Sequence, residues 1–258
     1  MNIATIKFDS FEKLQSDDCQ DRIIKARKAL GEKIVILGHH YQNETVYRHA
    51  DYAGDSLKLA QYVQQLDAKY IVFLGVHFMA EVSDILSRED QITVLPDLSA
   101  GCSMADMANL AKVERTYREL SKVLDFDQTI TPITYINSAA DLKAFCGEHN
   151  GIVCTSTNAP KILEWAFKKR PKVLFFPDQN LGRWTGYKMN IPLEDMTVWD
   201  PDLPLGGLTE KQIIDSKILL WKGHCAVHQM FRLEHIENFR ALHPDGLVIS
   251  HPESPFEV

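Results

Sequence analysis

Short β-branched runs alternate with amphipathic stretches along most of the chain, and this alternation constrains the fold more than any other feature. Strands are predicted at 33–38, 70–76, 92–96, 131–136, 151–155, 172–177, 217–221 and 246–250. Helices are predicted at 20–31, 55–66, 78–88, 103–110, 114–124, 139–148, 158–169, 209–215 and 230–242. Strands separated by helices of this length indicate βαβ units, so we expect an α/β protein with parallel sheets.

A weak internal repeat divides the chain. Val94-Leu95-Pro96-Asp97 closes one series of strands and Phe175-Phe176-Pro177-Asp178 closes the next, and a glycine-containing loop is predicted after each, the second at Gln179 to Gly186. We therefore expect units at 20–112 and 113–228, and the start of a third at 229–258. One strand cannot form a stable sheet alone, so the third unit is expected to be incomplete. Residues 187–210, rich in proline, are predicted to form a long loop.

The composition of the chain argues against nucleic-acid binding, a membrane-spanning segment and secretion. The 258 residues carry a formal net charge of -7 and no substantial basic run, which argues against nucleic acid as a partner. No apolar run reaches the roughly 18 to 20 residues that span a bilayer, and residues 1–18 lack the apolar core of a signal peptide. We therefore expect a cytoplasmic protein with no membrane partner, in which the five cysteines are free thiols or metal ligands.

Polar residues follow three of the predicted strands. His39 and His40 follow the first, Tyr135 and Asn137 end the fourth, and His251-Pro252-Glu253 follows the last. Because ligands bind beyond the carboxyl ends of parallel strands, these residues predict one site assembled from several units. One of the two adjacent histidines is expected to be functional. His251 and Glu253 form either a proton-handling pair on one face or an ordinary surface turn around Pro252.

Two cysteines occupy similar places in the two complete units. Cys102 and Cys225 each follow a glycine at a predicted turn from strand to helix, where a thiol pKa is lowered. They are either metal or cluster ligands or small residues that suit tight turns, and zinc fits less well because no CxxC spacing is present. Cys146 and Cys154 are expected in the core, and Cys19 has no assigned role.

Two helix starts carry hydroxyl groups. Gly54-Asp55-Ser56 and Thr155-Ser156-Thr157-Asn158 each precede a predicted helix. The free backbone N–H groups at such starts bind phosphate or carboxylate. The simpler interpretation is that each segment supplies an N-cap.

These segments together resemble the quinolinate synthase family, iron–sulfur enzymes of bacterial NAD biosynthesis. The resemblance runs from about residue 33 to the end, in order. It is carried by Gly38-His39-His40-Tyr41-Gln42, Gly54-Asp55-Ser56-Leu57, Gly75-Val76-His77-Phe78-Met79-Ala80-Glu81, Gly101-Cys102-Ser103, Tyr135-Ile136-Asn137, Cys154-Thr155-Ser156-Thr157-Asn158-Ala159, Phe176-Pro177-Asp178-Gln179-Asn180-Leu181-Gly182, Trp221-Lys222-Gly223-His224-Cys225-Ala226-Val227-His228 and His251-Pro252-Glu253.

The resemblance implies a pseudo-threefold repeat of three-layer α/β/α units around a central site. It implies a transferase- or lyase-type condensation of iminosuccinate (iminoaspartate) with dihydroxyacetone phosphate to quinolinate, with release of phosphate and water and with a [4Fe-4S] cluster as Lewis acid. The enzyme that makes iminosuccinate from aspartate is an expected partner. By resemblance Cys102 and Cys225 are cluster ligands, and Glu253, His251 and Tyr41 are catalytic. The implied substrate-binding residues are His39, Ser56, Tyr135, Asn137, Ser156, His251 and Glu253.

The sequence departs from the family pattern in two places. Ser254 stands where the family has a cysteine that is not a cluster ligand. The family's third unit also continues further and carries the third cluster cysteine, which is absent from this chain, so we expect the chain to be inactive alone. Two alternatives stay open at this point: a zinc- or iron-dependent hydrolase using His39, Glu253 and a cysteine, and a remnant that binds a metabolite or partner without turnover.

Overall fold

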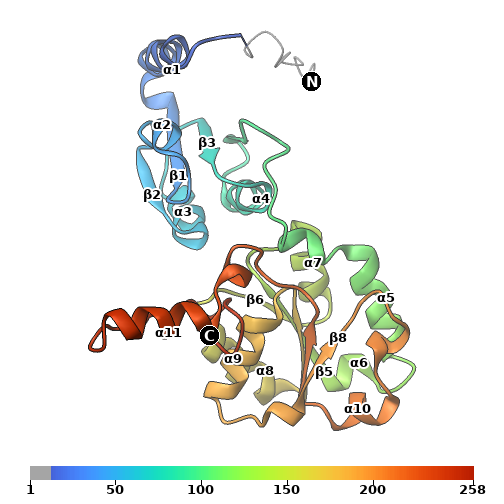
Figure 1. Ribbon diagram of the computed structural model, residues 1–258. Coiled ribbons are helices and arrows are strands. Elements are labelled where there is room, and N and C mark those ends of the chain that lie inside the picture. The colour runs from blue at the N-terminus through green and yellow to red at the C-terminus, as the bar shows by residue number, and fades with distance from the viewer. Residues whose placement is uncertain (1–12) are drawn as a thin grey trace.

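The computed structural model describes residues 13–258, and they contain two sheets in which every strand pairing is parallel (Figure 1). The first sheet has the order β2-β1-β3-β4 and the second β6-β5-β7-β9-β8. The first holds β1 (Ile34–His39), β2 (Tyr52–Gly54), β3 (Tyr70–Leu74) and β4 (Ile92–Val94). The second holds β5 (Ile130–Tyr135), β6 (Ile152–Cys154), β7 (Lys172–Phe176), β8 (Met196–Trp199) and β9 (Ile218–Trp221). The predicted α/β class with repeated parallel units is confirmed.

Helices connect the strands as βαβ units require. The first part of the chain has α1 (Ser16–Leu30), α2 (Glu44–Tyr47), α3 (Ser56–Val63) and α4 (His77–Leu86). The second has α5 (Leu110–Leu120), α6 (Phe126–Thr129), α7 (Ala140–Glu148), α8 (Ala159–Lys169), α9 (Gln179–Lys188), α10 (Glu210–Asp215) and α11 (Leu233–Leu242). None of the helices in residues 13–258 is long and apolar enough to cross a membrane.

The second sheet is buried on both faces because its strands are apolar at successive positions. Phe175 and Leu220 belong to one hydrophobic cluster, while their chain neighbours Leu174 and Leu219 belong to another. Since successive side chains in a strand point to opposite faces, these two clusters are the two layers that cover the sheet. The first sheet has its own cluster, to which Leu37, Ile71 and Phe73 contribute.

The two sheets share the same order of their first strands, and Cys102 and Cys225 follow corresponding strands. In each, the first strand in sequence lies between the second and the third, and a further strand pairs with the third. That further strand is β4 in the first sheet and β9 in the second. Cys102 follows β4 and Cys225 follows β9. The domain boundaries themselves stay a prediction.

The two units meet where α4 faces the start of α7. The Glu81 Oε2 atom accepts a hydrogen bond from the backbone N–H of Ala140 at 2.9 Å. The Lys143 amine donates to the Ser138 carbonyl and lies 5.7 Å from the centre of the Phe78 ring. Burial lowers the pKa of Lys143 to about 8. The described contact between the units is therefore partly polar.

Four sequence predictions fail locally. Residues 246–250 form no strand, and Leu247 and Ile249 are 88% and 93% exposed. The predicted loop at 187–210 contains β8, and the predicted glycine loop at 179–186 belongs to α9. Of the helix expected at 103–110 only one 3-10 turn forms, Ala105–Met107. The strand β8 forms because it pairs with β9, whereas residues 246–250 pair with no strand of the described sheets.

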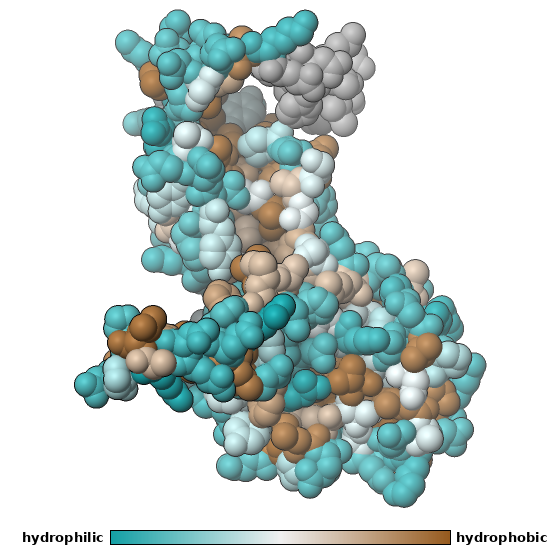
Figure 2. All heavy atoms as spheres, viewed as in Figure 1, coloured by the Kyte–Doolittle hydropathy of each residue, from teal (hydrophilic) through white to brown (hydrophobic). Residues whose placement is uncertain are grey.

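An apolar surface accompanies the last described helix. The helix α11 projects from the second unit, and none of its residues is buried (Figure 1). Leu233, Phe239 and Leu242 are among its exposed apolar side chains, and brown apolar atoms are visible on the projecting arm (Figure 2).

Candidate functional site

The carboxylate of Glu253 is the centre of the site. Glu253 is only 4% exposed, although the segment that carries it has no regular structure. Five groups from both units have raised pKa values, caused first by burial and then in part by the negative charge of Glu253. These groups are Tyr41, Cys102, Tyr135, Asp178 and Cys225. Since such interactions weaken with distance, residues far apart in the sequence converge on one carboxylate.

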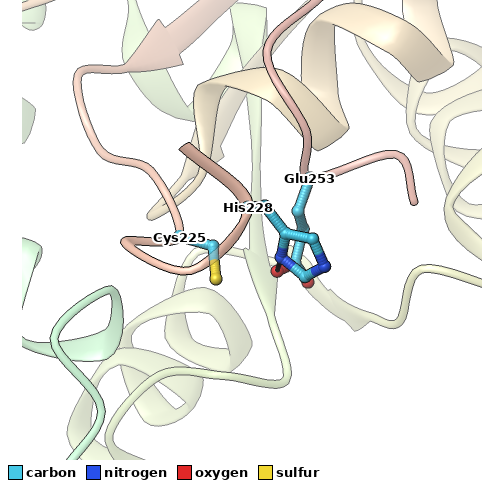
Figure 3. A group of neighbouring side chains, drawn as sticks. All are labelled: Cys225, His228 and Glu253. Atoms are coloured by element: carbon cyan, nitrogen blue, oxygen red, sulfur yellow. Dashed lines mark ion pairs between the residues drawn. The ribbon is translucent and has the colours of Figure 1, made fainter. Parts of the chain in front are cut away.

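Three potential metal ligands lie together beside this carboxylate (Figure 3). The ligand atoms of Cys225, His228 and Glu253 are within 4.8 Å of one another. His228 Nδ1 is 3.1 Å from Glu253 Oε2, and the His228 ring stacks on that of His251 at 4.6 Å. Sequence reasoning assigned no role to His228, although its three-residue spacing from Cys225 within a tight turn was a usable signal.

His251 and Glu253 lie in a turn and not on a strand, so of the two arrangements that the sequence left open the turn around Pro252 is the one that forms. The backbone N–H of Glu253 donates to His251 Nδ1 at 3.3 Å. Burial lowers the pKa of His251, and Glu253 opposes this effect. The turn nevertheless directs Glu253 inward, because Glu253 and Ser254 are both buried while His251 is exposed. The turn therefore carries a buried carboxylate into the site.

Tyr135, at the end of β5, connects Glu253 to the start of α8. Its side chain interacts with those of Glu253 and Ser156. Burial, with the charge of Glu253, raises the pKa of Tyr135 strongly, so its hydroxyl stays protonated and can donate. Ser156 is half-buried, and so is Asn137, which lies two residues beyond β5.

His39 ends β1 beside Gly54, the last residue of β2. The His39 side chain is 4% exposed, and its Nδ1 accepts a hydrogen bond from the backbone N–H of Tyr41 at 3.3 Å. Burial, with the neighbouring His40, lowers the pKa of His39 to about 4, so the ring is neutral at neutral pH.

The two helix starts differ in what their side chains do. Asp55 caps α3, because its Oδ1 accepts from the Lys58 N–H at 2.9 Å, and Ser56 is buried next to it. At the start of α8, Asn158 Oδ1 accepts from the Thr155 N–H at 2.7 Å. Asp55 therefore caps α3 with its side chain, whereas Asn158 closes the turn before α8 and makes no side-chain cap, and neither interaction uses the hydroxyls of Ser56 and Ser156.

Cys102 and Cys225 are half-buried free thiols, and the expectation of a lowered pKa at these cysteines is wrong. Burial raises the pKa of both, outweighing the backbone N–H groups that lower it. The pKa values rise because each thiol is partly desolvated, and the single helical turn after each cysteine offers too few N–H groups to offset this effect. Cys146 and Cys154 are fully buried in the core as predicted, and Cys19 lies in α1.

Comparison with known proteins identifies the family. Residues 21–258 match the family model described as quinolinate synthetase A protein. The chain belongs to this family. It is 52% identical over 260 residues to a quinolinate synthase of Rhodopirellula baltica, covering 96% of this chain and 66% of the relative. Against that of Corynebacterium glutamicum it is 50% identical over 251 residues, covering 97% and 64%. The quinolinate synthase of Bacillus cereus strain G9842 is 47% identical over 260 residues, covering 99% and 69%. The chain thus spans about two thirds of the length of these relatives.

Proposed function

We propose that this chain supplies most of the active site of a quinolinate synthase. The reaction would condense iminosuccinate with dihydroxyacetone phosphate to quinolinate, with release of phosphate and water. The observation that carries the proposal is the group of Cys225, His228 and Glu253, whose ligand atoms lie within 4.8 Å of one another, with the Tyr135 side chain in contact with the same carboxylate. A cytoplasmic location, and an enzyme that supplies iminosuccinate as partner, belong to the same proposal.

The donor set suits an iron–sulfur cluster. Cys102 and Cys225 are partly exposed thiols that follow equivalent strands, and the charge of Glu253 contributes to the raised pKa of both. They would hold a [4Fe-4S] cluster, which supplies Lewis acidity toward substrate oxygen when an iron is left open. Among the other described cysteines, Cys146 and Cys154 are fully buried. The non-thiol donors near Cys225 are His228 and Glu253.

The side chains around this position divide the work of binding and proton transfer. Tyr135 and Ser156 offer hydroxyl donors to a substrate carboxylate, because the Tyr135 hydroxyl stays protonated. Neutral His39 offers its Nε2 atom as a hydrogen-bonding group at the end of β1. The Glu253 carboxylate is the best placed acceptor for a substrate proton. His251 lies next to it, where it can exchange that proton with solvent.

Anaerobic reconstitution with iron and sulfide tests the proposal. We expect iron and sulfide to bind to the chain, to be lost in Cys102→Ala and Cys225→Ala, and to be kept in the matched control Cys19→Ala. Glu253→Gln should keep its iron and abolish the turnover measured for the unaltered protein under the same conditions. Stoichiometric zinc without sulfide would instead favour a hydrolase built on Cys225, His228 and Glu253.

A further inference from the structure

The Pro177-Asp178-Gln179-Asn180 segment has no role in the function proposed above, yet it is buried beside the site. Asp178 is 0% and Asn180 is 5% exposed. Asp178 lies two residues beyond the end of β7 and caps α9, with its Oδ1 accepting the Leu181 N–H at 2.6 Å. Its Oδ2 is also buried, and it accepts no hydrogen bond within residues 13–258. A helix cap alone does not require such burial, since Asp125 caps α6 from an exposed position.

One side of this segment holds the turn that carries Cys225. The Gln179 N–H donates to the Gly223 carbonyl at 3.0 Å. The two turns touch backbone to backbone, because a Cβ atom on Gly223 would lie 2.1 Å from the Pro177 carbonyl oxygen. The Cys225 N–H lies close enough to the Asp178 carboxylate to favour its charged form. The position of Cys225 therefore depends on the start of α9.

The other side of the segment holds Glu253. The Asn180 Nδ2 atom donates to the Glu253 backbone carbonyl at 3.3 Å. This bond is buried and joins residues 73 positions apart in the chain. The Glu253 segment has no strand or helix of its own. Its placement therefore depends on such side-chain contacts.

The helix α9 is itself fixed to the second sheet. A Cβ atom on Gly182 would lie 2.6 Å from a Leu220 methyl group and 2.8 Å from the Phe175 ring. A Cβ atom on Gly186 would lie 2.6 Å from the Met196 sulfur. The two glycines thus let α9 approach the sheet closely, which makes its first turn a rigid support.

We propose that the first turn of α9 is a positioning element that holds the Cys225 turn and the Glu253 segment at a fixed separation. Asp178 and Asn180 are its positioning residues. The significance of this inference rests on the proposed function. Its test, however, uses neither substrate nor metal, so either proposal can fail without the other.

The test measures alkylation of the full chain by iodoacetamide after chelator and reductant treatment, with mass spectrometry resolving Cys225 from Cys102. Asp178→Ala should accelerate alkylation of Cys225 by about fivefold, the factor that corresponds to one lost cap. Cys102 in the same sample should change by less than about twofold, within the ordinary scatter of surface effects. Asp178→Asn keeps an acceptor oxygen for Leu181 and should react like the unaltered chain. The control Asp125→Ala removes the cap of α6, which lies immediately before β5 at the amino end of that strand, and should leave Cys225 unchanged.

Equal acceleration of Cys102 and Cys225 would overturn the inference, because it would indicate general loosening. Alkylation of Cys225 in Asp178→Asn as fast as in Asp178→Ala would also overturn it, because charge and not geometry would then be responsible. If Asp178→Ala does not fold, Asn180→Ala provides the second test. Amide hydrogen exchange in residues 251–254 should then rise about fivefold, and unchanged exchange there would contradict the inference.

Discussion

The buried ring of His39 should make folding sensitive to acid. Its pKa is lowered from 6.5 to about 4 in the folded chain, mainly by burial. The unfolded chain therefore binds a proton that the folded chain does not between these pH values, and stability falls as pH falls through this window. With these two pKa values, His39 alone removes about 2 kcal/mol of stability between pH 7.5 and pH 5.

The variant His39→Asn tests this magnitude. The Asn Oδ1 atom can replace the Nδ1 acceptor that receives the Tyr41 N–H, but it does not titrate. Urea unfolding at pH 7.5, 6.5, 5.8 and 5.0 gives the free energy of unfolding of the variant and of the unaltered chain. As the pH falls from 7.5 to 5.0, the difference between these two free energies should shift by about 2 kcal/mol in favour of the variant. The matched control His40→Asn leaves the buried ring in place and should retain most of the acid sensitivity. A constant difference between His39→Asn and the unaltered chain at all four pH values would refute the reasoning.

Three other perturbations have defined outcomes. Gly151→Ala should destabilise the fold by about 1–3 kcal/mol in urea unfolding, since its Cβ would meet the Pro132 carbonyl oxygen at 2.1 Å. In contrast Gly147→Ala, whose Cβ meets nothing within 4 Å in α7, should stabilise by about 0.5–1 kcal/mol. Equal effects of the two would contradict this. Thr116→Val should cost about 1–3 kcal/mol because it leaves the buried Trp199 Nε1 donor without its 3.0 Å acceptor. An unchanged urea midpoint would mean that the indole finds another partner.

The fold class was predictable because strand and helix periods are explicit in this sequence. Runs such as Tyr70–Leu74 and Val173–Phe176 are apolar at consecutive positions, and both form strands, but only the second is buried throughout, because every second residue of β3 is half-buried. The strand β8 was missed because Met196–Trp199 is short and lies among prolines, so that only pairing with β9 makes it a strand. Residues 246–250 show the converse, since β-branched residues without a neighbouring strand do not form one.

The site was predictable in its residue types but not in its electrostatics. Glycine turns after equivalent strands directed attention to Cys102 and Cys225, and the structure places both within the influence of Glu253. Whether a thiol pKa rises or falls depends on how deeply the rest of the fold buries it, which no local motif contains. His228 escaped notice for a related reason, because its importance arises from the approach of Glu253, a residue 25 positions away.

The extra strand β8 makes the two cysteine supports mechanically unequal. Because β8 pairs with the outer side of β9, the strand before Cys225 is hydrogen-bonded along both edges. In the described sheets β4, which precedes Cys102, pairs with β3 alone and has only three residues. Cys225 thus follows a strand that is paired on both sides, and Cys102 follows a short strand at the edge of its sheet. If a group is bound between the two thiols, Cys225 would fix its position, and the backbone that carries Cys102 would move to fit the size of the group.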